Sequence, residues 1–517
     1  MITNSLARPA RLSVLRVLDF PRLVFAILFL WTLFAMDLHD PDYYWHLKAG
    51  EYILTHGALP AVDPFSYTFR GEPWVLHEWL FQVVLYAVFV WLGPFGVKVL
   101  TASLGTLSVY IGYAAAARLL NGSTAAVMLA IACFPLAALG FSPRPQLVTY
   151  VCFAACLYCL IDFKYFQRDR WLRALPVLMV PWVNSHGGYL AGIVLLVLFA
   201  SSEWLMYLVG KRADPVYRNR LLVLSLIGAL AVLATLANPY FIDHWIYPFQ
   251  VMNMDVAIAS IAEWQSPNFQ QLGFKLYLIL ALGFLIAWMY RGTGPDLTEI
   301  ALPVFFIVGG FVSVRHIPLA ALALIPFGAV AAREGAYASL YARWLNSGRQ
   351  LGAGEYLLNW AILAGVSIAL LAAYPLKHAR AMEARDAMIP VKAAEFIRKA
   401  GITGRMFNEY RFGGYLIYQF YPRQRVFIDG RADLFGDQFL KEYLDINNGA
   451  ADWDKLFDKH GIDYVITPRE APLRQLLLAR GDFRSVYEDD KNSVLVKNSP
   501  RFAWLIAQHD KHRDKTK

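Results

Sequence analysis

The sequence predicts a polytopic α-helical membrane protein with a soluble α/β domain at its C-terminal end. Of its 517 residues, 57% are hydrophobic and only 17% are charged, whereas soluble domains have about 25% charged residues. The charge is also unevenly distributed, because residues 1–375 contain 42 charged side chains and the much shorter stretch 376–517 contains 45. We therefore expect the first part to lie in a membrane and the second part in water.

Eleven apolar stretches in the first part approach the roughly 20 residues that a helix needs to cross about 30 Å of hydrocarbon. The first stretch follows four arginines between positions 8 and 22 and lacks a cleavage-site pattern. It is therefore expected to be an uncleaved anchor with a cytoplasmic N-terminus. The expected spans are residues 18–36, 96–118, 123–140, 147–163, 172–188, 189–209, 221–238, 273–290, 298–314, 316–332 and 357–375.

The run from Val75 to Leu92 is almost long enough to be a twelfth span, but the basic residues argue against it. If residues 76–92 form an external surface or re-entrant helix, most basic loops fall on the cytoplasmic side and the external loop 239–272 contains no Lys or Arg. The odd number of spans then places the C-terminal domain outside the cytoplasmic membrane.

Residues 376–508 are expected to form the α/β domain, followed by a charged and disordered tail at 509–517. Asp429 and Arg431 are expected to form a structural ion pair in this domain. Neither GxGxxG nor a P-loop is present, so the nearby glycines give little support for a nucleotide site. The periodicity indicates helices at 391–400 and 437–444, strands at 425–428 and 463–467, and a hairpin at 483–497.

Several classes of function are excluded or disfavoured by composition and spacing. The chain has 48 Lys and Arg against 39 Asp and Glu, but the basic residues are not clustered with aromatic ones, so no nucleic-acid partner is expected. All four cysteines lie in apolar runs and indicate no disulfide framework. His77-Glu78 is not the start of a zinc HExxH motif, because Phe81 stands where the second histidine would be.

The first external loop, Asp37 to Trp74, is the dominant polar feature of the membrane part. It contains six acidic residues directly after the first span. One explanation is simple solvation of a surface loop. The other is a functional site, because carboxylates beside a low-dielectric boundary have perturbed proton affinities and can act as a base or a metal ligand.

This loop resembles the first external loop of the GT-C glycosyltransferases, membrane enzymes that take sugars from polyprenyl-phosphate or polyprenyl-pyrophosphate carriers. The matching features are Asp42 after the first span, an amphipathic helix at 43–55, and then Gly57 and Pro60. The resemblance is to the protein mannosyltransferase and aminoarabinose transferase type. It implies that residues 1–375, with the large first external loop 37–95, form a GT-C membrane domain. It also implies a polyprenyl-linked sugar donor and a glycan, lipid or protein acceptor.

By this resemblance Asp42 is the candidate catalytic base, which takes the proton of the acceptor during an inverting transfer. Relatives usually have Asp-Glu at this point, whereas here Tyr43 replaces the Glu and Asp40 supplies the neighbouring acid. A divalent cation shared by Asp40 and Asp42 is therefore an open alternative, as are helix N-capping and plain solvation of Asp42. His46, one turn later on the same face, either orients the acid or a phosphate or is a half-exposed interfacial histidine.

Five further residues are candidates for substrate binding. Arg144, between two prolines, and the pair Arg315-His316 lie at predicted outer turns, where a guanidinium can hold a carrier phosphate or anchor to lipid headgroups. His186 lies in a polar break of an apolar run and is expected to line a cavity. Glu263 lies in a late external loop, and some GT-C enzymes bring an acid from such a loop to the site.

The leading hypothesis is an inverting glycosyltransferase that acts at the outer face of the cytoplasmic membrane. One alternative is a non-catalytic scaffold or transport subunit of an envelope-glycan system. Another is a lipid-linked glycan polymerase or ligase, which would depend on an external Arg or His more than on the acids of the first loop.

Overall fold

The computed structural model describes residues 17–38, 40–122, 124–210, 214–291, 294–333 and 351–516 of the chain. The arginines before position 17 and His39 of the first loop lie outside these residues. The chain divides into two compact units, each described by itself below. The bundle unit comprises residues up to 36, 95–239 and 263–375, and the mixed unit comprises 37–94, 240–262 and residues from 376 onward.

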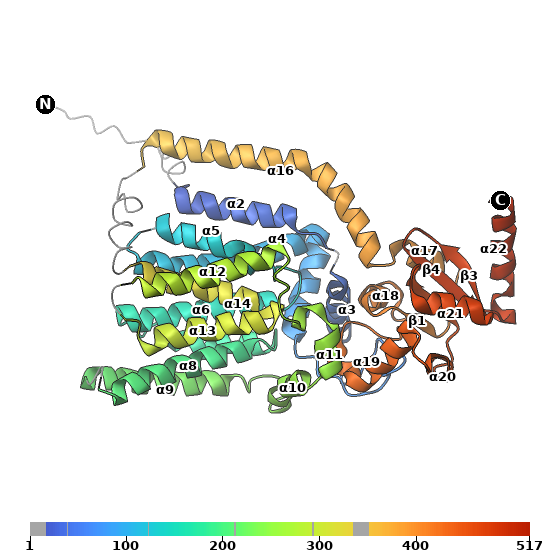
Figure 1. Ribbon diagram of the computed structural model, residues 1–517, viewed down its shortest axis with the longest axis horizontal. Helices are drawn as coiled ribbons and strands as arrows, with labels where there is room; N and C mark the ends of the chain where they lie inside the picture. The colour runs from blue at the N-terminus through green and yellow to red at the C-terminus, as the bar shows by residue number, and fades with distance from the viewer. Residues whose placement is uncertain are drawn as a thin grey trace. The chain divides into compact units, whose positions relative to one another are not determined.

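All eleven stretches predicted to span the membrane are helical (Figure 1). Within the described ranges, seven helices are long and apolar enough to cross a membrane, and four further apolar helices are shorter. The seven are α4 (Trp79–Leu119), α6 (Gln146–Phe166), α8 (Tyr189–Leu208), α9 (Pro215–Ala234), α12 (Leu272–Met289), η3 with α14 (Val314–Ala332) and α16 (Ala353–Met388). The shorter ones are α2 (Phe20–Ala35), α5 (Thr124–Ala138), η1 with α7 (Leu172–Val183) and α13 (Leu297–Val312).

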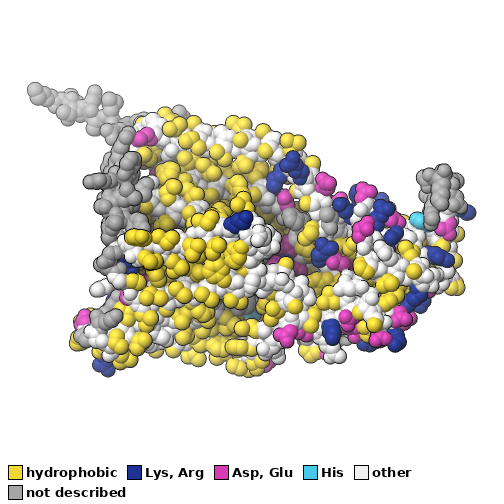
Figure 2. All heavy atoms as spheres, viewed as in Figure 1, with side chains coloured by type: hydrophobic (Ala, Val, Ile, Leu, Met, Phe, Trp, Pro, Cys, Tyr) yellow, Lys and Arg dark blue, Asp and Glu magenta, His cyan; other side chains and the backbone are white. Residues whose placement is uncertain are grey.

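The surface of these helices explains why the chain is a multi-pass membrane protein. On the face shown in Figure 2, hydrophobic side chains cover the bundle helices, whereas charged side chains gather over the C-terminal helices and strands. Helix α14 is buried along almost its whole length and forms the centre of the bundle. It packs against α5, α12, α13 and α6.

Helix α4 is interrupted at Gly93, where φ is 63° and ψ is −161°. Glycine tolerates this left-handed backbone because it has no Cβ atom, and Pro94 then begins a new helical section. The break coincides with the end of the stretch 76–92 that was predicted not to span.

Buried charges at the ends of several bundle helices are paired with one another. Lys164 on α6 contacts Glu203 on α8 and lies 2.7 Å from Asp296. Arg291 pairs with Glu299 at 2.5 Å, and the Tyr165 hydroxyl donates to the same carboxylate at 2.7 Å. Such pairing is required because an isolated charge in an apolar interior is costly.

The mixed unit contains a four-stranded sheet in the order β1-β2-β4-β3. β1 (Met406–Asn408) is parallel to β2 (Tyr464–Pro468), and β4 (Asn492–Lys497) is antiparallel to both β2 and β3 (Phe483–Glu488). The predicted hairpin at 483–497 and the strand at 463–467 are therefore confirmed. The helices around the sheet are α17 (Val391–Lys399), α18 (Gly413–Phe420), α19 (Ala432–Asn448), α20 (Trp453–Lys459), α21 (Pro472–Arg480) and α22 (Ala503–Thr516).

Two expectations for this domain are corrected. The tail that begins at residue 509 was expected to be disordered, but it is helical as far as Thr516, where α22 ends. Residues 425–428 do not form a strand of the sheet. They pair with the first loop instead. Val426 pairs with residues of the first loop, where its N–H donates to the Phe65 carbonyl and the Tyr67 N–H donates to the Val426 carbonyl, both at 3.1 Å.

Residues 240–262 also belong to the mixed unit, through helices α10 (Asp243–Met252) and α11 (Asp255–Ser260). The first turn of α11 is capped from a distance, because the Asp437 carboxylate accepts hydrogen bonds from the N–H groups of Val256 and Ala257 at 2.9 and 3.1 Å. A carboxylate at a helix N-terminus satisfies free N–H groups and complements the helix dipole.

The predicted ion pair of Asp429 and Arg431 is confirmed, and the structure adds Asp63 to it. The Arg431 guanidinium donates to Asp429 at 2.7 and 2.6 Å and to Asp63 at 2.7 Å, and all three side chains are at most 1% exposed. The guanidinium also lies over the ring of Trp74 at 4.5 Å. Asp63 accepts further bonds from the N–H groups of Phe65 and Ser66, each at 3.0 Å, so all three side chains of the triad have hydrogen-bond partners.

Replacing Arg431 by Gln should therefore destabilise the mixed unit strongly. The change leaves two buried carboxylates without a counter-charge, a loss that typically costs about 3–5 kcal/mol. The measurement is the unfolding midpoint of the purified protein in a denaturant titration, with Arg484→Gln as the control because Arg484 is exposed in the same unit. Equal midpoints for the two variants would show that the triad does not stabilise the unit.

Candidate functional site

The predicted acid helix of the first loop is α3, which runs from Pro41 to His56. Asp40 is its N-cap, and its Oδ1 accepts a hydrogen bond from the Asp42 N–H at 3.0 Å. The alternative that Asp42 itself caps the helix is therefore wrong, because the helix begins two residues earlier than predicted and Pro41 occupies its first position. The helix ends where the sequence indicated, at Gly57 with φ of 65°.

Asp42 lies in the first turn of α3, half-buried against the turn that contains Gly430. A Cβ atom at residue 430 would collide with the Asp42 carboxylate, and one at residue 414 would collide with the Pro41 carbonyl. The two glycine motifs of the C-terminal domain thus make room for the start of the acid helix. Because Gly430 stands between Asp429 and Arg431, the buried triad also fixes the backbone on which Asp42 rests.

His46 is buried, at 3% exposed, so the half-exposed interfacial alternative is wrong. Its Nδ1 lies 3.1 Å from the Gln82 side-chain nitrogen and 3.6 Å from the Glu78 carboxylate. Its ring also lies against that of Trp45, with 3.7 Å between centroids. These contacts hold α3 against the beginning of α4, and a role of His46 in orienting a substrate stays a prediction.

A cation shared by Asp40 and Asp42 also stays an open alternative. Among the described residues no group of three or more His, Cys, Asp and Glu side chains is placed to hold a metal ion. Mg²⁺ typically uses one or two carboxylates together with waters and substrate phosphates. Asp40 and Asp42 supply two carboxylates, so a cation shared by them would need waters or substrate phosphates as its other ligands.

In the bundle unit, three of the predicted binding residues come together although they are far apart in the sequence. Arg144 donates to the Glu263 carboxylate at 3.1 Å, and Arg315 lies over the ring of Trp264 at 4.3 Å. Two hydrogen bonds hold residues 263–265 against residues 313–314. The Ser313 hydroxyl donates to the Glu263 carbonyl at 2.9 Å, and the Val314 N–H donates to the Gln265 carbonyl at 3.0 Å. We call Arg144, Glu263, Trp264 and Arg315 the arginine patch.

The two arginines of the arginine patch differ in their partners. Arg144 is 17% exposed and already paired with Glu263, which is 49% exposed. Arg315 makes a cation–π contact with Trp264, and a guanidinium has several N–H donors with which it can bind a phosphate. His316 is exposed at the start of α14.

His186 lies in the turn between α7 and α8. Its Nδ1 is 2.8 Å from the Thr149 hydroxyl and accepts from the Gly188 N–H at 3.1 Å, and the Trp182 indole donates to the same hydroxyl at 2.8 Å. This network packs the turn against α6. The large apolar cavity of the bundle is lined by other residues, so the expected cavity-lining role of His186 stays a prediction.

Comparison with solved structures identifies the architecture. The crystal structure of ArnT from Cupriavidus metallidurans bound to undecaprenyl phosphate matches with a TM-score of 0.50 and 16% identity, over 92% of this chain and 97% of that one. The oligosaccharyltransferase AglB from Archaeoglobus fulgidus, in complex with an inhibitory peptide and a dolichol-phosphate, matches with a TM-score of 0.53 and 13% identity, over 86% and 69%. The chain has the GT-C fold.

The GT-C fold predicted from the first loop is therefore confirmed. At 13–16% identity these likenesses concern the fold and not the residues of a site. No protein-family model matches the sequence, and no curated protein matches it either.

The GT-C fold of this chain contains a histidine pair that the sequence did not indicate. In the mixed unit, the rings of His77 and His244 lie edge to face with 5.6 Å between centroids, and Tyr247 lies 4.4 Å from His77. The Leu76 N–H donates to the Tyr240 hydroxyl at 3.0 Å beside them. The pair thus joins the first loop to residues 240–262. Burial lowers the pKa of His77 to about 4 and that of His244 to about 3.

These pKa values predict that the mixed unit loses stability in mild acid. The neutral histidines are favoured in the folded state, so stability is complete above the unfolded pKa of about 6.5 and falls as the pH drops from there toward 4. At pH 5 the loss should be on the order of 1–2 kcal/mol per histidine. The measurement is the unfolding midpoint at pH 7.5 and pH 5.

The test variant is His244→Leu, whose unfolding midpoint should fall less between pH 7.5 and pH 5. The matched control is His56→Leu, whose midpoint should fall as much as that of the unmodified protein because His56 is exposed. An equal drop in both variants would show that the histidine pair is not the acid-sensitive element.

Proposed function

We propose that the protein is an inverting GT-C glycosyltransferase that moves a sugar from a polyprenyl-phosphate or polyprenyl-pyrophosphate carrier to an acceptor. The transfer takes place at the outer face of the cytoplasmic membrane, with the N-terminus in the cytoplasm and the C-terminal domain outside. The observation that supports this proposal is the position of Asp42. In a chain with the GT-C fold, this acid follows the first apolar helix and its carboxylate lies against Gly430, while Asp40 caps helix α3.

Asp42 is assigned the role of general base. Its carboxylate takes the proton of the acceptor as the acceptor atom attacks the anomeric carbon, and the bond from that carbon to the carrier oxygen breaks on the opposite face. The electron pair of the broken bond leaves with the carrier phosphate. Such proton transfer contributes about 10²–10⁴-fold to a rate.

Arg315 is assigned to the phosphate of the carrier. A guanidinium matches phosphate oxygens with two parallel N–H donors, and its charge stabilises the oxygen that becomes negative as the sugar departs. Trp264 supports this role because its ring lies 4.3 Å from the guanidinium carbon and helps to hold the side chain in place. Arg144 contributes positive charge beside it and is oriented by Glu263.

One observation favours the glycan polymerase or ligase as a second candidate. Its chemistry would depend on an external Arg or His, and Arg315 and His316 follow each other at a bundle turn, with His316 exposed. In that case substitutions at Arg315 and His316 would abolish activity, while Asp42→Asn would not.

The test is transfer by the purified protein from a panel of polyprenyl-phosphate sugars. Asp42→Asn should lower transfer by at least about 10²-fold, because the amide cannot accept the proton. Asp40→Asn should be mild, since Asn caps a helix about as well as Asp. Glu72→Gln is the matched control, because Glu72 is an exposed acid of the same loop.

The same assay separates the two mechanisms of the acids. If Asp40 and Asp42 share a cation, a chelator should abolish transfer and both substitutions should be equally damaging. Near-full transfer by Asp42→Asn with a confirmed donor would contradict both versions and favour the polymerase or ligase, whereas no transfer by the unmodified protein from any donor would favour a non-catalytic scaffold or transport subunit.

A further inference from the structure

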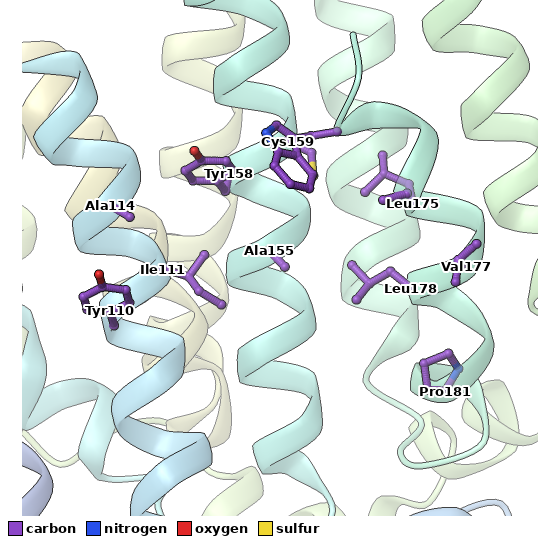
Figure 3. Close-up of a pocket in the computed structure, with 12 residues that line it drawn as sticks. Tyr110, Ile111, Ala114, Ala155, Tyr158, Cys159, Leu175, Val177, Leu178 and Pro181 are labelled. Carbon is purple, nitrogen blue, oxygen red and sulfur yellow. The ribbon is translucent and has the colours of Figure 1, made fainter. Parts of the chain in front are cut away.

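An apolar cavity of about 710 Å³ lies in the bundle unit, lined by residues of α4, α6, η1 and α7 (Figure 3). Small side chains, among them Ala114, Ala155 and Ala174, leave the space that the cavity occupies, and larger ones such as Leu175 and Leu178 line it. Ligand sites in proteins have volumes of roughly 300–1,000 Å³. The cavity is thus large enough for a molecule, and its lining selects an apolar one.

The cavity is distant from the arginine patch. Arg144 directly precedes α6, whereas the α6 residues that line the cavity are Ala155, Tyr158 and Cys159, in the second half of the helix. At 1.5 Å per residue, Tyr158 lies about 20 Å further along the bundle than Arg144. The positive charge nearest to the cavity is therefore not that of the residues assigned to the carrier phosphate.

The end of the cavity near Trp171 and Tyr158 is positively charged. Arg168, Arg170 and Arg173 are all exposed there, and Arg170 lies over the Trp171 ring at 5.0 Å. The neighbouring acids are already paired, Asp169 with Arg220 at 3.1 Å and Asp162 with Arg118 at 2.5 Å. Exposed arginines beside Trp and Tyr at the end of apolar helices match the anionic headgroup region of a bilayer.

We propose that this cavity holds one acyl chain of an anionic phospholipid, with the phosphate of the headgroup at Arg170 and Arg173. The apolar lining buries the chain, and the exposed guanidinium groups of Arg170 and Arg173 select an anionic headgroup over a zwitterionic one. The lipid is a resident of the bundle, separate from the carrier substrate.

The test is native mass spectrometry of the full chain, purified in mild detergent from membranes that contain phosphatidylglycerol and phosphatidylethanolamine. The unmodified protein should retain phosphatidylglycerol. Ala155→Trp fills the cavity and should reduce the retained phosphatidylglycerol by at least about fivefold. The double variant Arg170→Glu/Arg173→Glu should reduce it as much, and its substitutions are on the surface, so its folding is not at risk.

The matched controls are Ala229→Trp and Arg218→Glu, which make the same kinds of change at exposed positions of α9. Both should retain lipid as the unmodified protein does. Retention of phosphatidylethanolamine equal to phosphatidylglycerol, of a polyprenyl phosphate alone, or of detergent alone would overturn the proposal. Undiminished retention by both the Ala155→Trp and the double-arginine variants would also overturn it.

Discussion

The guanidinium of Arg431 is buried between two carboxylates from distant parts of the chain, and the mixed unit is built around this contact. Asp63 fixes the loop 63–68 through its hydrogen bonds, and that loop then pairs with Val426. Asp429 and Arg431 hold the turn on either side of Gly430, where the carboxylate of Asp42 rests. One buried cation therefore connects the loop after the first apolar helix, the C-terminal sheet region and the acid that we assign to catalysis.

The same principle, that charges inside a low-dielectric interior need partners, explains the polar residues of the bundle. Glu203 lies in an otherwise apolar helix and is satisfied by Lys164, Thr298 and Tyr217 from other elements. The arginine patch differs because it is open to solvent, with Glu263 about half exposed. An ion-pair network that is closed to solvent stabilises the packing of helices. A network that is open to solvent can exchange one of its charged side-chain partners for a charged ligand.

Length and hydropathy were sufficient to predict the helices of the bundle, because few structures other than a membrane-spanning helix accommodate an apolar stretch of about 20 residues. The pattern of the first loop predicted the GT-C fold, and alternation predicted the C-terminal hairpin. The contacts of the site were not predictable in this way. Asp63 and Arg431 are separated by 368 positions and Arg144 and Glu263 by 119, and local periodicity contains no information on such pairs. The burial of His46 was missed for the same reason, since Gln82 is its partner across 36 positions.

The central claim is that the acid of the first loop is seated on the C-terminal domain at Gly430, and a disulfide tests it most directly. The double variant Asp42→Cys/Gly430→Cys places two thiols where the structure has Asp42 against residue 430, within the short Cβ separation that a disulfide requires. The four native cysteines are buried and should not compete. Under mild oxidation in native membranes, peptide mapping should find residues 42 and 430 cross-linked, and reduction should release them. Two thiols that stay free and reactive with an alkylating reagent under the same conditions would contradict the account.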